Sequence, residues 1–328
     1  MIFDFTDDQY AFAASVDAAV AATAPVSTLR KAWTEPDPHH DLWQQLGDIG
    51  LLGLLVPDAH GGSGATTVDA ALAIERVGYH AVATPVADTA IVLPSLLAEG
   101  NELDTIASGD LRVTTVTEQA CLAPFATIAD RFLVVADDSV HLLGRDQITL
   151  APVAAQDRSL DLARVIATTA QPATVVGDAA RLRTLRAMTT ALTQVGLCQR
   201  LLDMTVEYVQ QRHQFGRPIG SFQAIKHGLA DAAVDLEAAR SLAWYAAYAV
   251  AHDQDDAGTA AHAAVAASSA AATRASQAAL QFHGGIGFTA EHDLQLFLHR
   301  AKALQVLGGT RSAHRRAVGL DFLRRHAS

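Results

Sequence analysis

Cysteine is scarce in this chain of 328 residues, where Cys121 and Cys198 stand alone and far apart. Two such residues make neither a disulfide framework nor a metal knuckle. Histidine is more common, but the adjacent pair His39 and His40 lacks the spacing and the acidic partners of a metal site. We therefore expect neither structural disulfides nor a bound metal.

An excess of positive charge is also missing, because the formal net charge is −11. Without a basic stripe to displace counterions from phosphates, nucleic acid is not an expected partner. Polar or charged residues interrupt every long apolar stretch, so no membrane span is expected either. The acidic start "MIFDFTDDQYAFAAS" lacks the basic region of a signal peptide. These features predict a cytoplasmic protein.

Half of the residues are hydrophobic, which is enough for a large core, and residues 1–100 carry helical patterns. Thr6, followed three places later by Gln9, has the capping-box spacing that begins a helix. A further helix is expected in "TTVDAALAIERVGYHAVATP", with Val68, Leu72 and Val77 in the core. Residues 1–100 are therefore predicted to form an N-terminal helical domain.

The pattern changes over residues 101–177, where short β-branched runs are separated by Asp, Gly and Pro. These runs are "LRVTTV", "RFLVVADD", "SVHLLG", "ITLAPV" and "ARVIATT". Their spacing predicts a small antiparallel sheet or barrel.

Residues 178–328 return to helical patterns and predict a C-terminal bundle. The expected helices are 180–211, 222–252, 258–282, 291–306 and 311–326. The third is rich in alanine, which suits close helix packing. The predicted fold is mainly α, with a small β-domain between the two helical parts.

Glycine-rich "HGGSG" (60–64) and "HGGIG" (283–287) fit no nucleotide-binding loop when each is taken alone. In combination with their surroundings they are more specific. The stretches "RHQFGRPIGSFQAIKHGLAD" (212–231) and "LQFHGGIGFTAEHDLQLFLHRA" (280–301) resemble the acyl-CoA dehydrogenase family. "LWQQLGDIGLLGLLVPDAHGGSG" (42–64), followed by "AIERVGYH", resembles the first helical domain of that family. The resemblance implies an N-terminal α-domain, a β-domain and a four-helix bundle.

The resemblance also implies FAD, bound where two subunits meet. In the family, the turn after the first bundle helix and a glutamine–glycine segment reach the adenosine diphosphate of a neighbouring subunit's FAD. A guanidinium offers forked donors to a pyrophosphate, and glycines let backbone N–H groups approach the cofactor. The residues that match are Arg212, Gln214, Phe215, Phe222, Gln223, Gln281, Gly284 and Gly285.

The other half of the family's cofactor site is missing from residues 115–130, which read "TVTEQACLAPFATIAD". Thr117 and Glu118 are what remains of a Thr-Glu-Pro segment, and the Gly-Ser-Asp that follows it in the family is lost. The three tryptophans, Trp33, Trp43 and Trp244, all lie outside the β region, so no indole is available there for the flavin.

The catalytic glutamate is missing as well. In the family it stands in a Tyr-Glu-Gly-Thr segment, whose place is taken here by "LGGT" (307–310), with Gly308 at the glutamate. The alternative position, on the helix before the turn, is Arg186. Neither glycine nor a permanently charged guanidinium can act as a general base.

Three interpretations fit this pattern of loss. The favoured one is the non-catalytic subunit of a heteromeric acyl-CoA dehydrogenase, inactive alone. Such a subunit resembles the short chains of α2β2 enzymes in actinobacterial sterol side-chain degradation, in which a longer partner carries the glutamate. The resemblance implies a steroid acyl-CoA substrate. The alternatives are a homomeric enzyme with a displaced base, Glu291 or Glu118, and a flavin-free scaffold. A scaffold has no need for Arg212 and Gln281.

Overall fold

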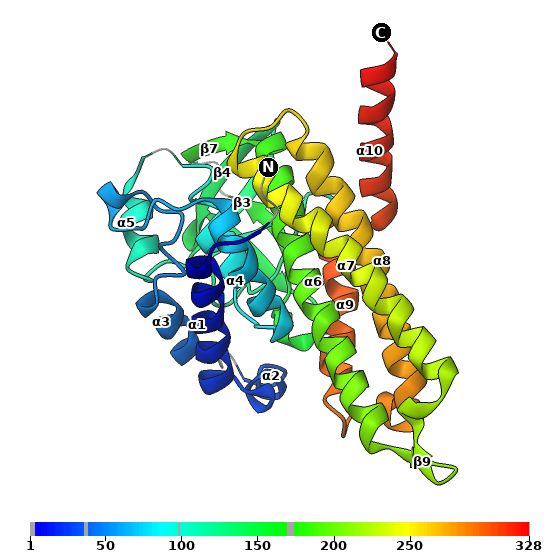
Figure 1. Cartoon of the computed structure of the whole chain (residues 1–328). Helices are drawn as coiled ribbons and strands as arrows, with labels where there is room; N and C mark the ends of the chain where they lie inside the picture. The colour runs from blue at the N-terminus through cyan, green and yellow to red at the C-terminus, as the bar shows by residue number, and fades with distance from the viewer. Residues whose placement is uncertain (1–3, 36–38, 98, 169–173, 328) are drawn as a thin grey trace.

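The computed structural model describes residues 4–35, 39–97, 99–168 and 174–327. Helices of the first third pack on one side of the first bundle helix, the strands lie behind them, and long helices form the other side (Figure 1). A single core cluster runs from the first helices through the bundle, and a second small cluster fills the β region. The predicted mainly α fold with a small β-domain is confirmed.

The N-terminal helices follow the predicted signals. They are α1 (Asp7–Thr23), α2 (Val26–Lys31), α3 (His40–Asp48), α4 (Thr67–Tyr79) and α5 (Asn101–Ala107), with a π-helical turn at Asp88–Val92 before α5. The capping box is confirmed, because Thr6 and Gln9 exchange side-chain-to-backbone hydrogen bonds at the start of α1. In α4, Leu72 and Val77 are buried as predicted, whereas Val68 is only half-buried.

The β region forms two sheets. The first has the order β1 (Val113–Thr115), β3 (Arg131–Ala136), β4 (Ser139–Gly144) and β7 (Thr174–Asp178). The second has the order β2 (Leu122–Ala123), β6 (Ala163–Thr168) and β5 (Ile148–Pro152). Strands β2 and β7 have no counterpart among the predicted runs.

One strand pair departs from the antiparallel prediction, since β1 and β3 run parallel. The chain leaves β1, pairs β2 in the second sheet and returns to the first sheet at β3. Such a crossover allows the parallel orientation, which a tight hairpin does not. The remaining pairs of both sheets, where the structure describes them, are antiparallel.

The bundle helices agree closely with the predicted ranges. They are α6 (Ala179–Gln211), α7 (Gln223–Ala251), α8 (Ala257–His283), α9 (Leu294–Leu307) and α10 (Arg311–His326). Helices α6, α7 and α8 lie side by side, and α10 projects beyond them (Figure 1). None of the helices within the described ranges is long and apolar enough to span a bilayer.

Helices α4 and α6 cross with their backbones in contact. A Cβ atom on Gly78 would lie 2.2 Å from the backbone oxygen of Thr193, and one on Gly196 would lie 1.9 Å from the backbone oxygen of Glu75. Real Cβ atoms do not approach backbone so closely, so the crossing requires glycine on both helices. The N-terminal helices are thereby fixed against the bundle.

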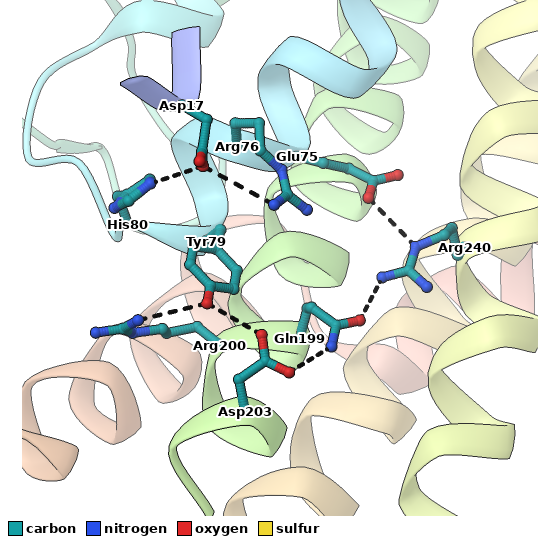
Figure 2. A network of polar contacts seen from close by, with 9 residues as sticks. All are labelled: Asp17, Glu75, Arg76, Tyr79, His80, Gln199, Arg200, Asp203 and Arg240. Atoms are coloured by element: carbon teal, nitrogen blue, oxygen red, sulfur yellow. Dashed lines mark hydrogen bonds and ion pairs between the residues drawn. The ribbon is translucent and has the colours of Figure 1, made fainter. Parts of the chain in front are cut away.

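A polar network surrounds this crossing (Figure 2). It comprises Asp17, Glu75, Arg76, Tyr79, His80, Gln199, Arg200, Asp203 and Arg240. The carboxylate of Glu75 is 3% exposed; it lies 3.3 Å from the Arg240 guanidinium and accepts from the Trp244 indole. Burial raises the pKa of Glu75 despite the attraction of Arg240. Truncating either partner of such a pair would leave a buried charge unpaired.

A second buried ion pair joins the three parts of the chain. The Nε atom of Arg300, on α9, lies 2.5 Å from a carboxylate oxygen of Asp157 in the β region. The same guanidinium donates to the carbonyls of Ala81 and Val82, at 3.1 and 2.9 Å, and to the hydroxyl of Ser159 at 2.8 Å. One side chain therefore holds the bundle, the β region and the segment after α4 together.

The helix crossing gives the first testable prediction. Gly78→Ala should lower the free energy of unfolding by about 1–3 kcal/mol, the usual cost of overpacking, because the new methyl group meets immobile backbone. The matched control is Gly319→Ala on α10, where a Cβ atom meets nothing within 4 Å. There alanine should stabilise the helix by about 0.5–1 kcal/mol. Equal melting temperatures for the two variants in a thermal scan would contradict the tight crossing.

Candidate functional site

A cavity of about 390 Å³ lies where the first half of α6 meets the segment after β1 and the junction of α9 with α10. It is the place where the sequence predicts the remnants of an active site. Its lining includes Thr117, Glu118, Arg183, Arg186, His262, Leu307, Gly308 and His314. The two positions predicted for a missing base, 308 and 186, are thus brought together.

Neither position can provide a base. A Cβ atom on Gly308 would lie 2.5 Å from the Cγ2 atom of Thr190 and 3.0 Å from the carbonyl oxygen of Leu304. A side chain at position 308 would therefore require the Thr190 side chain or the local backbone to shift. Arg186 is half-buried at the cavity wall, and its guanidinium stays protonated.

Glu118, one of the two candidates for a displaced base, faces this cavity but is tied to an arginine. The Arg183 guanidinium holds it with two forked hydrogen bonds of 2.9 and 2.7 Å. The hydrogen bond to Glu118 is the largest cause of a raised pKa at Arg183. Both oxygens of this carboxylate already accept hydrogen bonds from Arg183, so Glu118 would have to leave this ion pair to reach a substrate.

Glu291, the other candidate, precedes α9, whereas Gly308 follows it. Helix α9 has 14 residues, and at 1.5 Å per residue the two positions are separated by about 21 Å along the helix axis. Glu291 is exposed and lies at the wrong end of α9 for this cavity.

A histidine pair in the cavity wall was missed by the sequence analysis. The Nδ1 atoms of His262 and His314 lie 2.8 Å apart, and the Nε2 atom of His314 lies 2.8 Å from the carbonyl oxygen of Gly308. Because a carbonyl only accepts, His314 carries its proton on Nε2, and its Nδ1 atom accepts a hydrogen bond from the Nδ1–H group of His262. The available signal was His262, a histidine in the middle of the alanine-rich stretch of helix α8.

Both imidazoles are held neutral. Burial is the main cause that lowers the pKa of His262, with the adjacent His314 as a second cause. Burial likewise lowers the pKa of His314, although its hydrogen bond to the Gly308 carbonyl opposes the shift. The cavity wall therefore has two uncharged rings beside the charged Arg186.

The predicted cofactor residues lie elsewhere, and the first group follows α6. Arg212 ends that helix, and a two-stranded hairpin, β8 (His213–Gln214) with β9 (Arg217–Pro218), follows it. Phe215 and Gly216 turn the hairpin with φ values of 54° and 78°, and Phe215 is 91% exposed. The Arg212 guanidinium is exposed and has no partner in the part of the chain that the structure describes.

Phe222 and Gln223 begin helix α7 beside the hairpin. The Arg217 guanidinium lies 4.1 Å from the centre of the Phe222 ring, and the Phe215 ring meets Phe222 edge-on at 6.1 Å. Gln223, the first residue of α7, is exposed. The hairpin is thus stiffened by ring contacts, while its polar side chains face outward.

The second group lies at the end of α8. Gln281, Gly284 and Gly285 are exposed, and a Cβ atom on either glycine would meet nothing within 4 Å. This end of α8 packs against the first turns of α7, which follow the hairpin, because Phe282 lies beside Gly228. The structure therefore brings both predicted groups to one end of the bundle (Figure 1).

The cavity and the exposed groups lie at opposite ends of α6. Arg186 and Arg212 are 26 positions apart, and α6 is continuous between them. At 1.5 Å per residue they are separated by about 39 Å. A cofactor in contact with Arg212 can reach the cavity of this chain only across the length of the bundle.

Comparison with known proteins agrees with this architecture. Residues 6–103 match the acyl-CoA dehydrogenase N-terminal domain, and residues 179–321 match the acyl-CoA dehydrogenase C-terminal domain. The chain belongs to the acyl-CoA dehydrogenase family. It is 36% identical over 286 residues to the acyl-CoA dehydrogenase IpdE2 of Mycolicibacterium smegmatis, an alignment that covers 85% of this chain and 87% of that protein.

Solved structures of acyl-CoA dehydrogenases share the fold. The ChsE4-ChsE5 complex from Mycobacterium tuberculosis contains a chain that matches with a TM-score of 0.86 and 24% identity, over 98% of this chain and 99% of that one. A chain of the Tcur3481-Tcur3483 steroid ACAD matches with a TM-score of 0.87, 24% identity and the same coverage.

The matched ranges include the stretches predicted to hold the cofactor. The stretches 212–231 and 280–301, which carry the predicted cofactor residues, lie inside the matched C-terminal domain. Residues 115–130, where the sequence predicts that a Gly-Ser-Asp segment is lost, lie between the two matched ranges. The cavity is therefore lined both by residues of the matched C-terminal domain, such as Arg186 and Gly308, and by residues outside the matched ranges.

The histidine pair predicts a dependence of stability on pH. A histidine in the unfolded chain titrates near pH 6.5, and His262 titrates lower in the folded chain. Stability from the neutral pair is therefore fully present above about pH 6.5 and is lost as the pH falls toward the folded pKa. His262→Gln should lose less melting temperature than the wild type between about pH 7.5 and pH 5.5. Parallel losses would show that the pair does not titrate with folding.

Proposed function

We propose that this chain is the non-catalytic subunit of a heteromeric FAD-dependent acyl-CoA dehydrogenase. It contributes half of an FAD site at the interface with a longer partner, and that partner supplies the catalytic glutamate in an α2β2 assembly. The reaction is the α,β-dehydrogenation of an acyl-CoA thioester. The chain alone is expected to be inactive.

The observation that carries the proposal is the distance between the two halves of the site. The predicted cofactor residues Arg212, Gln281, Gly284 and Gly285 are exposed at one end of the bundle, about 39 Å along α6 from the cavity. Side chains that are exposed, unpaired and remote from the chain's own cavity are suited to a cofactor that another subunit holds.

The exposed end fits an adenosine diphosphate. Arg212 offers a forked set of donors with no competing partner in the described part of the chain, and such a fork suits a pyrophosphate. Gly284 has a φ of 61° and open space where a Cβ atom would stand, so its backbone can approach a ligand closely.

The chain's own cavity does not fit the flavin ring of the family. Its wall contains no indole, and the carboxylate that remains from the Thr-Glu-Pro segment, Glu118, is engaged by Arg183. A side chain at position 308 would meet Thr190. Both the flavin contacts and the base must then come from the partner.

In this proposal the chain holds and orients the cofactor, and the partner carries the residue that reacts with the substrate. An acyl-CoA dehydrogenase of this fold from Bacillus anthracis is complexed with FAD, and a bound FAD would supply the acceptor for the hydride of the β-carbon. Arg212 and the backbone at Gly284 would hold its adenosine diphosphate, and Phe215 and Phe222 would limit the movement of the turn. The partner's glutamate would take the α-proton.

The alternatives receive less support from the geometry. A homomeric enzyme needs a displaced base, but Glu118 is bound to Arg183 and Glu291 lies about 21 Å from Gly308. A flavin-free scaffold leaves the exposed, unpaired Arg212 without a role. The heteromer accounts for both the retained and the lost residues.

A steroid acyl-CoA thioester is the substrate class that we propose. The Tcur3481-Tcur3483 protein of the same fold is a steroid ACAD, and the ChsE4-ChsE5 protein is a complex. The identity to each is 24%. A steroid substrate and a heteromeric partner are therefore the first candidates to test. The proposed partner is a longer acyl-CoA dehydrogenase that retains the glutamate.

Arg212→Ala tests the shared site in the assembled complex. Loss of a charge-assisted hydrogen bond costs roughly 1.5–3 kcal/mol, which is about a ten- to hundredfold loss of FAD affinity. FAD retention after gel filtration should fall, and excess FAD should restore much of the rate because the partner's base is untouched. Lys226→Ala, which removes an exposed positive charge from the first turn of α7, is the control.

The competing role for Arg212 is a favourable interaction with the C-terminal end of α6, where cations are stabilising. In that case Arg212→Ala would lower the melting temperature slightly while FAD retention stayed at the wild-type value. The same would follow if Lys226→Ala released as much FAD as Arg212→Ala, because net charge alone would then explain the loss.

A further inference from the structure

The cavity beside Gly308 contains one charge that the protein leaves unbalanced. Arg186 is half-buried in its wall, and its guanidinium makes no hydrogen bond or ion pair with any described residue. Arg183, one turn earlier on α6, is by contrast held by Glu118 through the bonds described above. The acidic group in the cavity wall is thus already in use.

An arginine in this state favours an external anion. Burial without a partner raises the free energy of a charge, and a bound counter-ion with matching acceptors offsets that cost. The guanidinium has five N–H donors in a planar fork that suits the two oxygens of a carboxylate. The neighbouring histidines are neutral and Arg183 is paired with Glu118, so the unpaired positive charge at the wall is that of Arg186.

Most of the remaining cavity wall is apolar, although Thr115, Thr117, Gln119 and Thr310 also line it. Val116, Leu122, Leu182, Val306 and Leu307 line it. The volume of about 390 Å³ falls in the range of small-molecule sites, which are mostly apolar with a few polar groups that fix orientation. The occupant is therefore expected to have an apolar body and one polar end.

We propose that this cavity binds an apolar molecule that carries a single carboxylate, with Arg186 as the partner of the anion. One guanidinium balances one negative charge, which favours a monocarboxylate over a dianionic phosphate ester. The site is distinct from the shared cofactor site, since Arg212 lies about 39 Å away along α6. The cavity would thus bind a ligand without reacting with it, because neither Gly308 nor Arg186 can act as a base.

The test uses decanoate as the probe and decanol as its uncharged match, titrated calorimetrically into the purified protein in the assembly that it forms. Decanoate should bind, and decanol should bind at least about tenfold more weakly, because it cannot accept the charged fork. Arg186→Gln should weaken decanoate binding by about ten- to hundredfold. Arg186→Lys, which keeps the charge and loses the fork, should fall between.

Arg181→Gln is the control on the same helix, because Arg181 pairs with Asp253 and is not part of the cavity wall. It should leave decanoate binding unchanged. A melting temperature for Arg186→Gln equal to that of the wild type shows that the variant is folded.

Three results would overturn the proposal: no decanoate binding by the wild type, equal binding of decanol, or unchanged affinity in Arg186→Gln. The first would indicate that a segment of a partner subunit fills the cavity. None of these readouts involves flavin or turnover. The proposal can therefore fail while the heteromer stands, and the reverse also holds.

Discussion

The backbones of α4 and α6 touch at Gly78 and Gly196, and the rest of the structure depends on that contact. It fixes the N-terminal helices against the first bundle helix without intervening side chains. The buried ion pair of Glu75 with Arg240 joins α4 to α7. The ion pair of Arg300 with Asp157 joins α9 to the β region. Helix α6 thereby contacts N-terminal helix α4, strands of the β region and the other bundle helices α7, α8 and α9.

The length of α6 separates two kinds of site. Near its start, the cavity has a glycine at position 308 and an arginine at position 186, and Thr190 lies beside Gly308. At its end, the hairpin and the tip of α8 present an unpaired arginine, exposed aromatic rings and open glycines. Because the cavity and the exposed end are about 39 Å apart along α6, we propose that the exposed end serves a cofactor held by another subunit.

Local chemistry explains which features could be predicted from the sequence. The capping box at Thr6, the ends of the bundle helices and the turn after Arg212 depend on neighbouring residues, and the structure agrees with each. The parallel pairing of β1 with β3 depends on a crossover through the second sheet. Two hydrogen-bonded pairs could not be predicted from any local pattern, because their members are far apart in the sequence. His262 and His314 are 52 positions apart, and Glu118 and Arg183 are 65 positions apart.

The central claim is that this subunit lends its exposed end to an FAD that its partner holds. The most direct test is to co-express the chain with a longer acyl-CoA dehydrogenase from the same genome, then measure the mass of the complex and its flavin absorbance. The account predicts an α2β2 mass with one FAD per heterodimer and no activity in this chain alone. A yellow homo-oligomer of this chain, with one FAD per chain and acyl-CoA oxidation of its own, would contradict it.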